Sequence, residues 1–198
     1  MLYWSDQMAE LRKSDLLKKY NLSQTILLSE DSEKNYSANR LKEIASNFSF
    51  SNTYDVFLSH SYDDARLVLQ IKEMLTSFGY IVYVDWIDDN QLDRQHVSSN
   101  TAGIIRSRMR KCKSLIYLTS PKAEKSVWMP WELGFMDAQS GRVGVASILD
   151  DDDDFDGREY LGLYPYLDLT ANNFYLHKSI SEWVTFSEWM QGYDPIYH

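Results

Sequence analysis

The segment Ser126–Gly134 contains the residues of this chain that are best suited to chemistry. It brings Trp128, Trp131 and Glu132 together shortly after an apolar run at Leu115–Leu118. Indole rings attract flat cationic groups, and a carboxylate can stabilise positive charge on a bound sugar. The segment therefore predicts either a site for a cationic or sugar-bearing ligand, or an ordinary core in which Glu132 begins an amphipathic helix. Taken alone, it favours the core interpretation.

Four short apolar runs predict the strands of a parallel sheet. They begin about 30 residues apart, which is the length of a βαβ unit, and they are apolar on both faces, as strands buried beneath helices require. The runs are Tyr54–Ser59, Ile81–Asp85, Ser114–Thr119 and Val143–Leu149. We therefore predict an α/β fold with an open parallel sheet of about five strands and helices on both faces.

Apolar residues at three- and four-residue spacing predict helices between and after these strands. The first helix has Ser61 and Asp64 as its expected caps and stops at Gly79. The others are marked by Ile105, Met109 and Cys112, by the stretch from Trp131 to Gln139, and by Trp183, Phe186 and Trp189. We expect Trp131 to lie in the core and Cys112 to be buried and unreactive.

Residues 1–50 differ in composition from the rest of the chain. They are polar and charged with short stretches of helical spacing, so we predict a helical N-terminal extension over residues 1–50 and one domain over residues 51–198. A chain of 198 residues is long enough for one domain with a sizeable core. The acidic run Asp150–Asp154 lacks the spaced ligands of a calcium loop, and we expect a solvated loop there.

Charge and cysteine content argue against several classes of function. The net charge of −9 argues against bulk binding to nucleic acid or to an anionic membrane. Cys112 is the only cysteine, which excludes an internal disulfide and a cysteine-built metal site, and the four histidines are too scattered to suggest a metal motif. No apolar run approaches the roughly 20 residues of a membrane span, and the start lacks a signal-peptide pattern. We expect a soluble, cytoplasmic protein.

Polar residues follow the predicted strands at the edge where open α/β folds bind their ligands. His60 and Ser61 follow the first strand, Asp85 and Trp86 lie at the end of the second, and the chain beyond the third leads to Glu132. Because the carboxyl ends of parallel strands meet at one edge, we expect these residues to converge. This convergence favours the site interpretation of Glu132. Capping a helix remains the alternative for His60, and bonding to nearby backbone remains the alternative for Asp85.

Three segments resemble motifs of the Toll/interleukin-1 receptor (TIR) domain family. Tyr54–His60 resembles the first-strand box of the family, and Gly79–Asp85 resembles its second strand. The run Ser126-x-Trp128-x-x-x-Glu132-Leu133 resembles the Ser-x-Trp-Cys-x-x-Glu-Leu signature of the NAD-cleaving branch, with Met129 where cysteine often stands. Each motif alone is weak, but the three occur in order and at suitable spacing.

This resemblance implies a flavodoxin-like fold and a bacterial stand-alone enzyme for which NAD+ is a substrate and no cofactor. The implied activity is a nicotinamide-releasing hydrolase or cyclase in Thoeris-like antiphage defence, whose ADP-ribose-derived product acts on a separate effector protein. The residues that match the family site are the catalytic Glu132 and the NAD-binding His60, Ser61, Asp85, Trp86 and Trp128. The family also implies a homo-oligomer formed through TIR–TIR contacts.

One carboxylate is chemically sufficient for this reaction. Nicotinamide is a pyridinium in NAD+ and leaves as a neutral ring, so no general acid has to protonate it. The difficult part is the positive charge that develops on the ribose, which an ionised Glu132 can stabilise. A non-catalytic TIR scaffold acting through homotypic contacts is the alternative, although such a scaffold has no chemical need for Glu132 beside Trp128.

Overall fold

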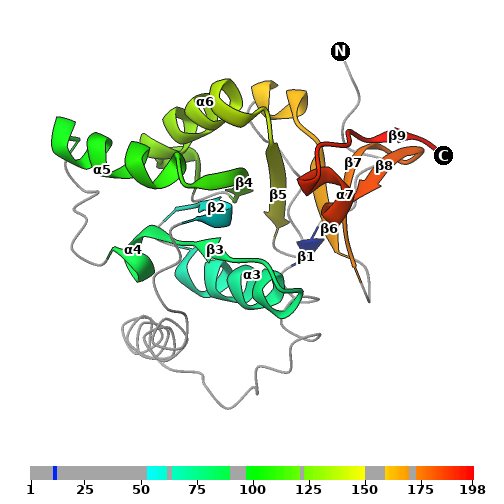
Figure 1. The fold of residues 1–198 in the computed structure, drawn as a ribbon, viewed down its shortest axis with the longest axis horizontal. Coiled ribbons are helices and arrows are strands. Elements are labelled where there is room, and N and C mark those ends of the chain that lie inside the picture. The colour runs from blue at the N-terminus through cyan, green and yellow to red at the C-terminus, as the bar shows by residue number, and fades with distance from the viewer. Residues whose placement is uncertain are drawn as a thin grey trace.

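The structure, a computed structural model, describes most of the chain beyond residue 52. The described residues are 11–12, 53–61, 64–89, 97–120, 123–149, 159–169 and 173–198. Their strands form one mixed sheet in the order β3-β2-β4-β5-β6-β7-β8-β9, and the short strand β1 pairs with β5. Helix α3 covers one face of this sheet, while α5 and α6 cover the other (Figure 1).

The first five strands in this order are parallel, as the sequence predicts. They are β2 (Tyr54–Ser59), β3 (Val82–Tyr83), β4 (Cys112–Thr119), β5 (Val143–Leu149) and β6 (Tyr166–Leu169). Three antiparallel strands that the sequence analysis does not predict extend the sheet beyond β6. They are β7 (Phe174–Ser179), β8 (Glu182–Thr185) and β9 (Ile196–Tyr197). The parallel α/β core is thus confirmed.

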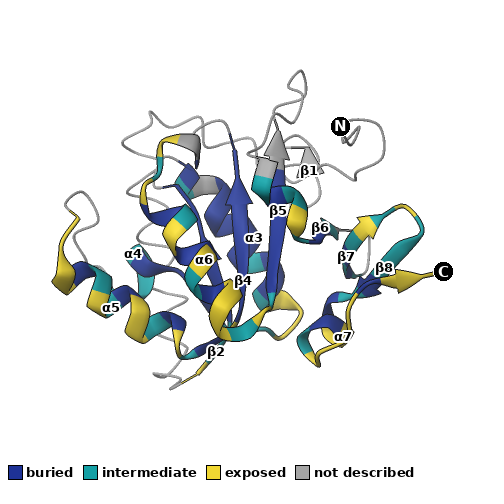
Figure 2. Ribbon diagram, turned by 90° about the horizontal axis from the view of Figure 1, so that it is seen from above, coloured by how far each residue is buried: buried dark blue, intermediate teal, exposed yellow. Residues whose placement is uncertain are grey.

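The helices bury their apolar faces on the two sides of the sheet (Figure 2). The helices are α3 (Ala65–Ser77), α4 (Asp85–Asp88), α5 (Ser99–Met109), α6 (Trp128–Ser140) and α7 (Phe186–Met190), with 3-10 turns at Ala123–Lys125 and Glu159–Leu163. Side chains alternate along β2, so that Val56 and Leu58 pack with α3 while Phe57 packs with α5 and α6. This alternation decides which strand residues reach the face that carries α6.

Two expectations about helices are wrong at particular residues. Cys112 begins β4 and does not end α5, because an apolar residue three positions after Met109 suits a helical stripe and also the first inward position of the next strand. Cys112 is buried as expected, and burial raises the pKa of its thiol. Trp183 lies in β8, where it pairs with His177, so the C-terminal helix α7 begins only at Phe186.

Most of the predicted N-terminal extension lies outside the described residues. Within it, Leu11 and Arg12 form β1, which pairs in parallel with Ile148 and Leu149 at the end of β5. The acidic run at residues 150–154 also lies outside the described residues. Across the part of the chain that is described, no helix is both long enough and apolar enough to cross a bilayer.

Candidate active site

The pair formed by Ser59 and Glu132 is the centre of the candidate site. Ser59 is the last residue of β2, and its Oγ donates a hydrogen bond of 2.6 Å to Oε2 of Glu132 in the second turn of α6. Neither residue has any exposed surface. Because Ser59 follows Phe57 by two residues, its side chain points to the same face of the sheet as Phe57, which is the face that α6 covers.

The start of α6 places Glu132 over the end of β2. Ser126 Oγ accepts a 3.3 Å hydrogen bond from the backbone N–H of Met129, which satisfies one of the free donors of the first turn. The helix ends at Gly141, whose φ of 61° is the left-handed conformation that closes many helices. The observed helix begins at Trp128, three positions before the predicted start, and this shift moves Glu132 from the first residues of the helix into its second turn.

Burial makes the Glu132 carboxylate chemically unusual. Removing a carboxylate from water is costly unless hydrogen bonds replace the lost solvation. The 2.6 Å bond from Ser59 lies in the range of charge-assisted O–H···O⁻ bonds, which stabilise an ionised acceptor. Electrostatic interactions of such a carboxylate are strong, because little water screens them. The site is therefore suited to stabilising positive charge on a ligand that reaches Glu132.

His60 joins the ends of β2 and β3, as the sequence analysis predicts. Its Nδ1 lies 2.8 Å from the carbonyl oxygen of Leu58 and donates to it, which leaves Nε2 free to accept a 2.7 Å hydrogen bond from the indole Nε1–H of Trp86. Oδ1 of Asp85 lies 3.4 Å from the same Nε2. Three of the predicted site residues are thus brought together at one edge of the sheet, with His60 and Asp85 both buried.

Asp64 has a different role from the predicted one. It occupies the N-cap position of α3, but its side chain makes no capping hydrogen bond. Its Oδ2 instead accepts a 2.5 Å hydrogen bond from Ser120, which follows β4 at the same edge of the sheet. Ser61, the other predicted cap and a predicted NAD-binding residue, is buried nearby, and its carbonyl oxygen accepts from the backbone N–H of Asp64 at 3.1 Å. Asp64 therefore joins Asp85 and Glu132 as a third buried carboxylate at this edge.

Trp131 of α6 lies in a different environment from the predicted one. Trp128 is only 7% exposed and packs in the core with Met129 and Leu133, whereas Trp131 is 36% exposed, so the prediction that Trp131 lies in the core is wrong. The rings meet edge to face, with centroids 5.7 Å apart. Once α6 begins at Trp128, the positions facing the sheet include Met129 and Leu133, and Trp131 falls between them on the outer side. Contact between Trp128 and nicotinamide stays a prediction.

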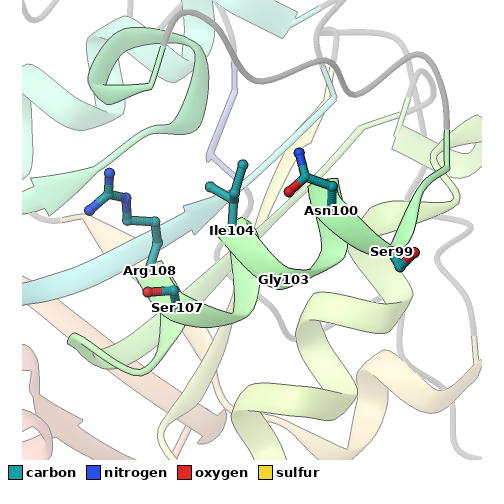
Figure 3. A pocket seen from close by; sticks show the side chains of 6 residues that line it. All are labelled: Ser99, Asn100, Gly103, Ile104, Ser107 and Arg108. Atoms are coloured by element: carbon teal, nitrogen blue, oxygen red, sulfur yellow. The ribbon is translucent and has the colours of Figure 1, made fainter.

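A hollow of about 360 Å³ lies elsewhere, along helix α5 (Figure 3). Its lining consists of Ser99, Asn100, Gly103, Ile104, Ser107 and Arg108, and none of the predicted site residues is among them. No group of three or more histidine, cysteine, aspartate or glutamate side chains in the described ranges is arranged to hold a metal ion. The buried carboxylates at the edge of the sheet are therefore the stronger candidate for a site.

The sequence places Ser59 at the end of the first strand, on this edge, but predicts neither its bond to Glu132 nor the bond between Asp64 and Ser120. A serine that ends a strand carries no signal of its own, but its even spacing from Phe57 could have placed it on the α6 face. The sequence predicts a helix cap for Asp64, since acidic residues are common there. Its position just after β2 was the signal for an alternative role at the edge.

The chain is similar to known proteins of one family. Residues 56–184 match the family model described as TIR domain. The chain is 44% identical over 168 residues to a protein of Bacillus cereus (strain MSX-D12) named "Probable 3' cyclic ADP-D-ribose synthase ThsB'", covering 81% of this chain and 87% of that one. It is also 31% identical over 97 residues to the "Putative cyclic ADP-D-ribose synthase TIR2" of Cytobacillus dafuensis, covering 48% of this chain and 26% of that one.

Proposed function

This chain belongs to the TIR domain family, and from that premise we propose that it cleaves NAD+, releases nicotinamide and closes the remaining ADP-ribose into a cyclic product. The observation that carries the proposal is the fully buried Glu132, bonded to Ser59 at the carboxyl edge of the parallel sheet. The names of both relatives, which describe cyclic ADP-ribose synthases, support the cyclic product.

In the first step, the bond between the ribose carbon C1 and the nicotinamide nitrogen breaks. The bonding electrons leave with nicotinamide, which becomes a neutral ring and needs no proton. Positive charge develops on the ribose, and the Glu132 carboxylate stabilises it electrostatically. Ser59 holds the carboxylate in place through the 2.6 Å hydrogen bond, so little reorganisation is needed as the charge appears.

In the second step, an oxygen nucleophile attacks the ribose cation. If a hydroxyl of the same ADP-ribose attacks, a C–O bond forms, the hydroxyl proton is lost to a base, and the product is cyclic. If water attacks, the product is linear ADP-ribose. The names of the two relatives support the cyclic outcome.

The setting of the reaction is part of the proposal. Glu132 has no exposed surface, so NAD+ reaches it only if the side chains that cover it move apart. We expect self-association through TIR–TIR contacts to favour that opening, in the cytoplasm of a bacterium under phage attack. The product then acts on a separate effector protein.

The experiment compares Glu132→Gln with Glu73→Gln, a matched change on α3 away from the site. Purified proteins are incubated with NAD+ over a range of protein concentrations, with and without lysate of infected cells, and nicotinamide is measured by chromatography and products by mass spectrometry. We expect wild type and Glu73→Gln to release nicotinamide and form a cyclic product, and Glu132→Gln to lose at least about 100-fold in rate. Full activity of a folded Glu132→Gln protein refutes the role of Glu132. Absence of nicotinamide from wild type under all these conditions favours a scaffold.

A further inference from the structure

Two consecutive carboxylates at the end of α4 are held by helices on opposite faces of the sheet. Lys72 of α3 contacts Asp88, with Nζ 3.1 Å from Oδ2. Arg108 of α5 contacts Asp89 through two hydrogen bonds of 2.6 and 2.7 Å. Helix α4 lies at the β3 edge of the sheet, between α3 below and α5 above (Figure 1). The turn that follows β3 is therefore bound by an ion pair to a helix on each face of the sheet.

The Lys72–Asp88 pair is the inner contact. The Lys72 side chain is 9% exposed, and its burial lowers the pKa of the ammonium while Asp88 opposes that effect. Oδ2 of Asp88 also accepts a 2.7 Å hydrogen bond from the backbone N–H of Val84, the residue just before α4. Asp88 thus links α3 to both ends of the four-residue helix.

The Arg108–Asp89 pair is the outer contact. The guanidinium binds both carboxylate oxygens of Asp89, and the hydroxyl of Tyr83 donates to Oδ2 of Asp89 at 2.8 Å. The Arg108 side chain is 31% exposed and lines the hollow along α5 (Figure 3). Two parallel N–H···O bonds fix direction as well as distance, which a single ammonium contact cannot do.

The held turn carries two of the residues that meet His60. A helix of four residues has no stability of its own in water, so tertiary contacts must hold α4 in place. Asp85 and Trp86 are its first two residues, and they contact His60 at 3.4 and 2.7 Å. We propose that Lys72 and Arg108 are positioning residues, which keep Asp85 and Trp86 against His60 during catalysis. This inference rests on the proposed function for its catalytic part, since neither residue is placed in contact with substrate.

The test uses the indole N–H of Trp86 as a reporter that needs no substrate. The ¹H–¹⁵N resonance of this group is assigned by its absence from the spectrum of Trp86→Phe. Its chemical shift and its rate of hydrogen exchange with solvent are then compared between wild type, Lys72→Met and Arg108→Met. Lys113→Met is the matched control, because it removes a different ion pair, between Lys113 and Asp55 at 2.7 Å, that does not involve α4. Nicotinamide release is measured on the same samples.

We expect Lys72→Met and Arg108→Met each to shift the Trp86 resonance and to speed its exchange about 10-fold or more, with kcat/KM for nicotinamide release reduced about 10- to 100-fold. Lys113→Met should change none of these three quantities. Arg108→Lys should restore the resonance only in part, because it loses the two-bond geometry.

An unchanged Trp86 resonance in folded Arg108→Met and Lys72→Met overturns the inference, whatever the activity. A shifted resonance with undiminished activity overturns its catalytic part. A wild-type protein that releases no nicotinamide instead overturns the proposed function, and the resonance still reports on the holding of α4.

Discussion

Replacing Ser59 by alanine tests whether this serine stabilises a buried charge. The variant removes the 2.6 Å hydrogen bond to Glu132. Water cannot replace this bond, because neither residue has exposed surface. Hydrogen bonds to charged groups contribute about 1.5–3 kcal/mol, against about 0.5–1.5 kcal/mol for neutral pairs. We therefore expect Ser59→Ala to reduce the free energy of unfolding by about 1.5–3 kcal/mol at pH 7. For a chain of this length, that lowers the midpoint of thermal unfolding by about 3–12 °C.

The chain offers a matched control for this prediction. Ser114 of β4 is equally buried, and its Oγ donates at 2.9 Å to the uncharged backbone oxygen of Asp55. Ser114→Ala should therefore cost only about 0.5–1.5 kcal/mol. Urea unfolding of both variants gives the comparison, and the cost of Ser59→Ala should fall to about 1 kcal/mol when Glu132 is already glutamine. A cost for Ser59→Ala no greater than that for Ser114→Ala, or an unchanged cost in the glutamine background, would refute the reasoning.

Two further predictions concern burial. Trp128→Ala should reduce the free energy of unfolding by about 3–5 kcal/mol and Trp131→Ala by less than about 1.5 kcal/mol, because only the first ring is deeply buried; equal losses in urea unfolding contradict the placement of α6. Burial raises the pKa of Tyr166 to about 12, above its value of about 10 in an unfolded chain, so its contribution to stability is complete below pH 10 and is lost as the pH rises through 12. Tyr166→Phe should flatten the fall in stability above pH 10, and an unchanged slope counts against this cause.

The parallel part of the fold was predictable because its signals are local. Apolar runs about 30 residues apart and a helical stripe ending at Gly79 each identify one element without reference to the others. The antiparallel strands were not predictable in this way. Trp183, Phe186 and Trp189 fit a helical period, yet Trp183 joins β8 and stacks on His198 with centroids 3.9 Å apart. That contact depends on the pairing of β8 with β9, which the spacing of apolar residues does not indicate.

The sequence predicts at which edge of the sheet the candidate site lies, but it does not predict the hydrogen bonds within the site. The rule that ligands bind at the carboxyl ends of parallel strands brought His60, Asp85 and Trp86 together correctly. The partner of Glu132 depends on which face of β2 Ser59 occupies and on the turn of α6 that carries the glutamate. The face of Ser59 follows from its spacing from Phe57, whereas the turn that carries Glu132 depends on where α6 begins, which is three residues before the predicted start.

The antiparallel strands beyond β6 also determine how copies of this protein can meet. In the main strand order of the described residues, the two outermost strands are β3 and β9, and each has only two residues. Such short edges offer few unpaired backbone groups to another chain, which protects the sheet from growing by strand addition. The self-association that we propose must then be made by helices and loops, and its geometry can change without any strand having to unpair.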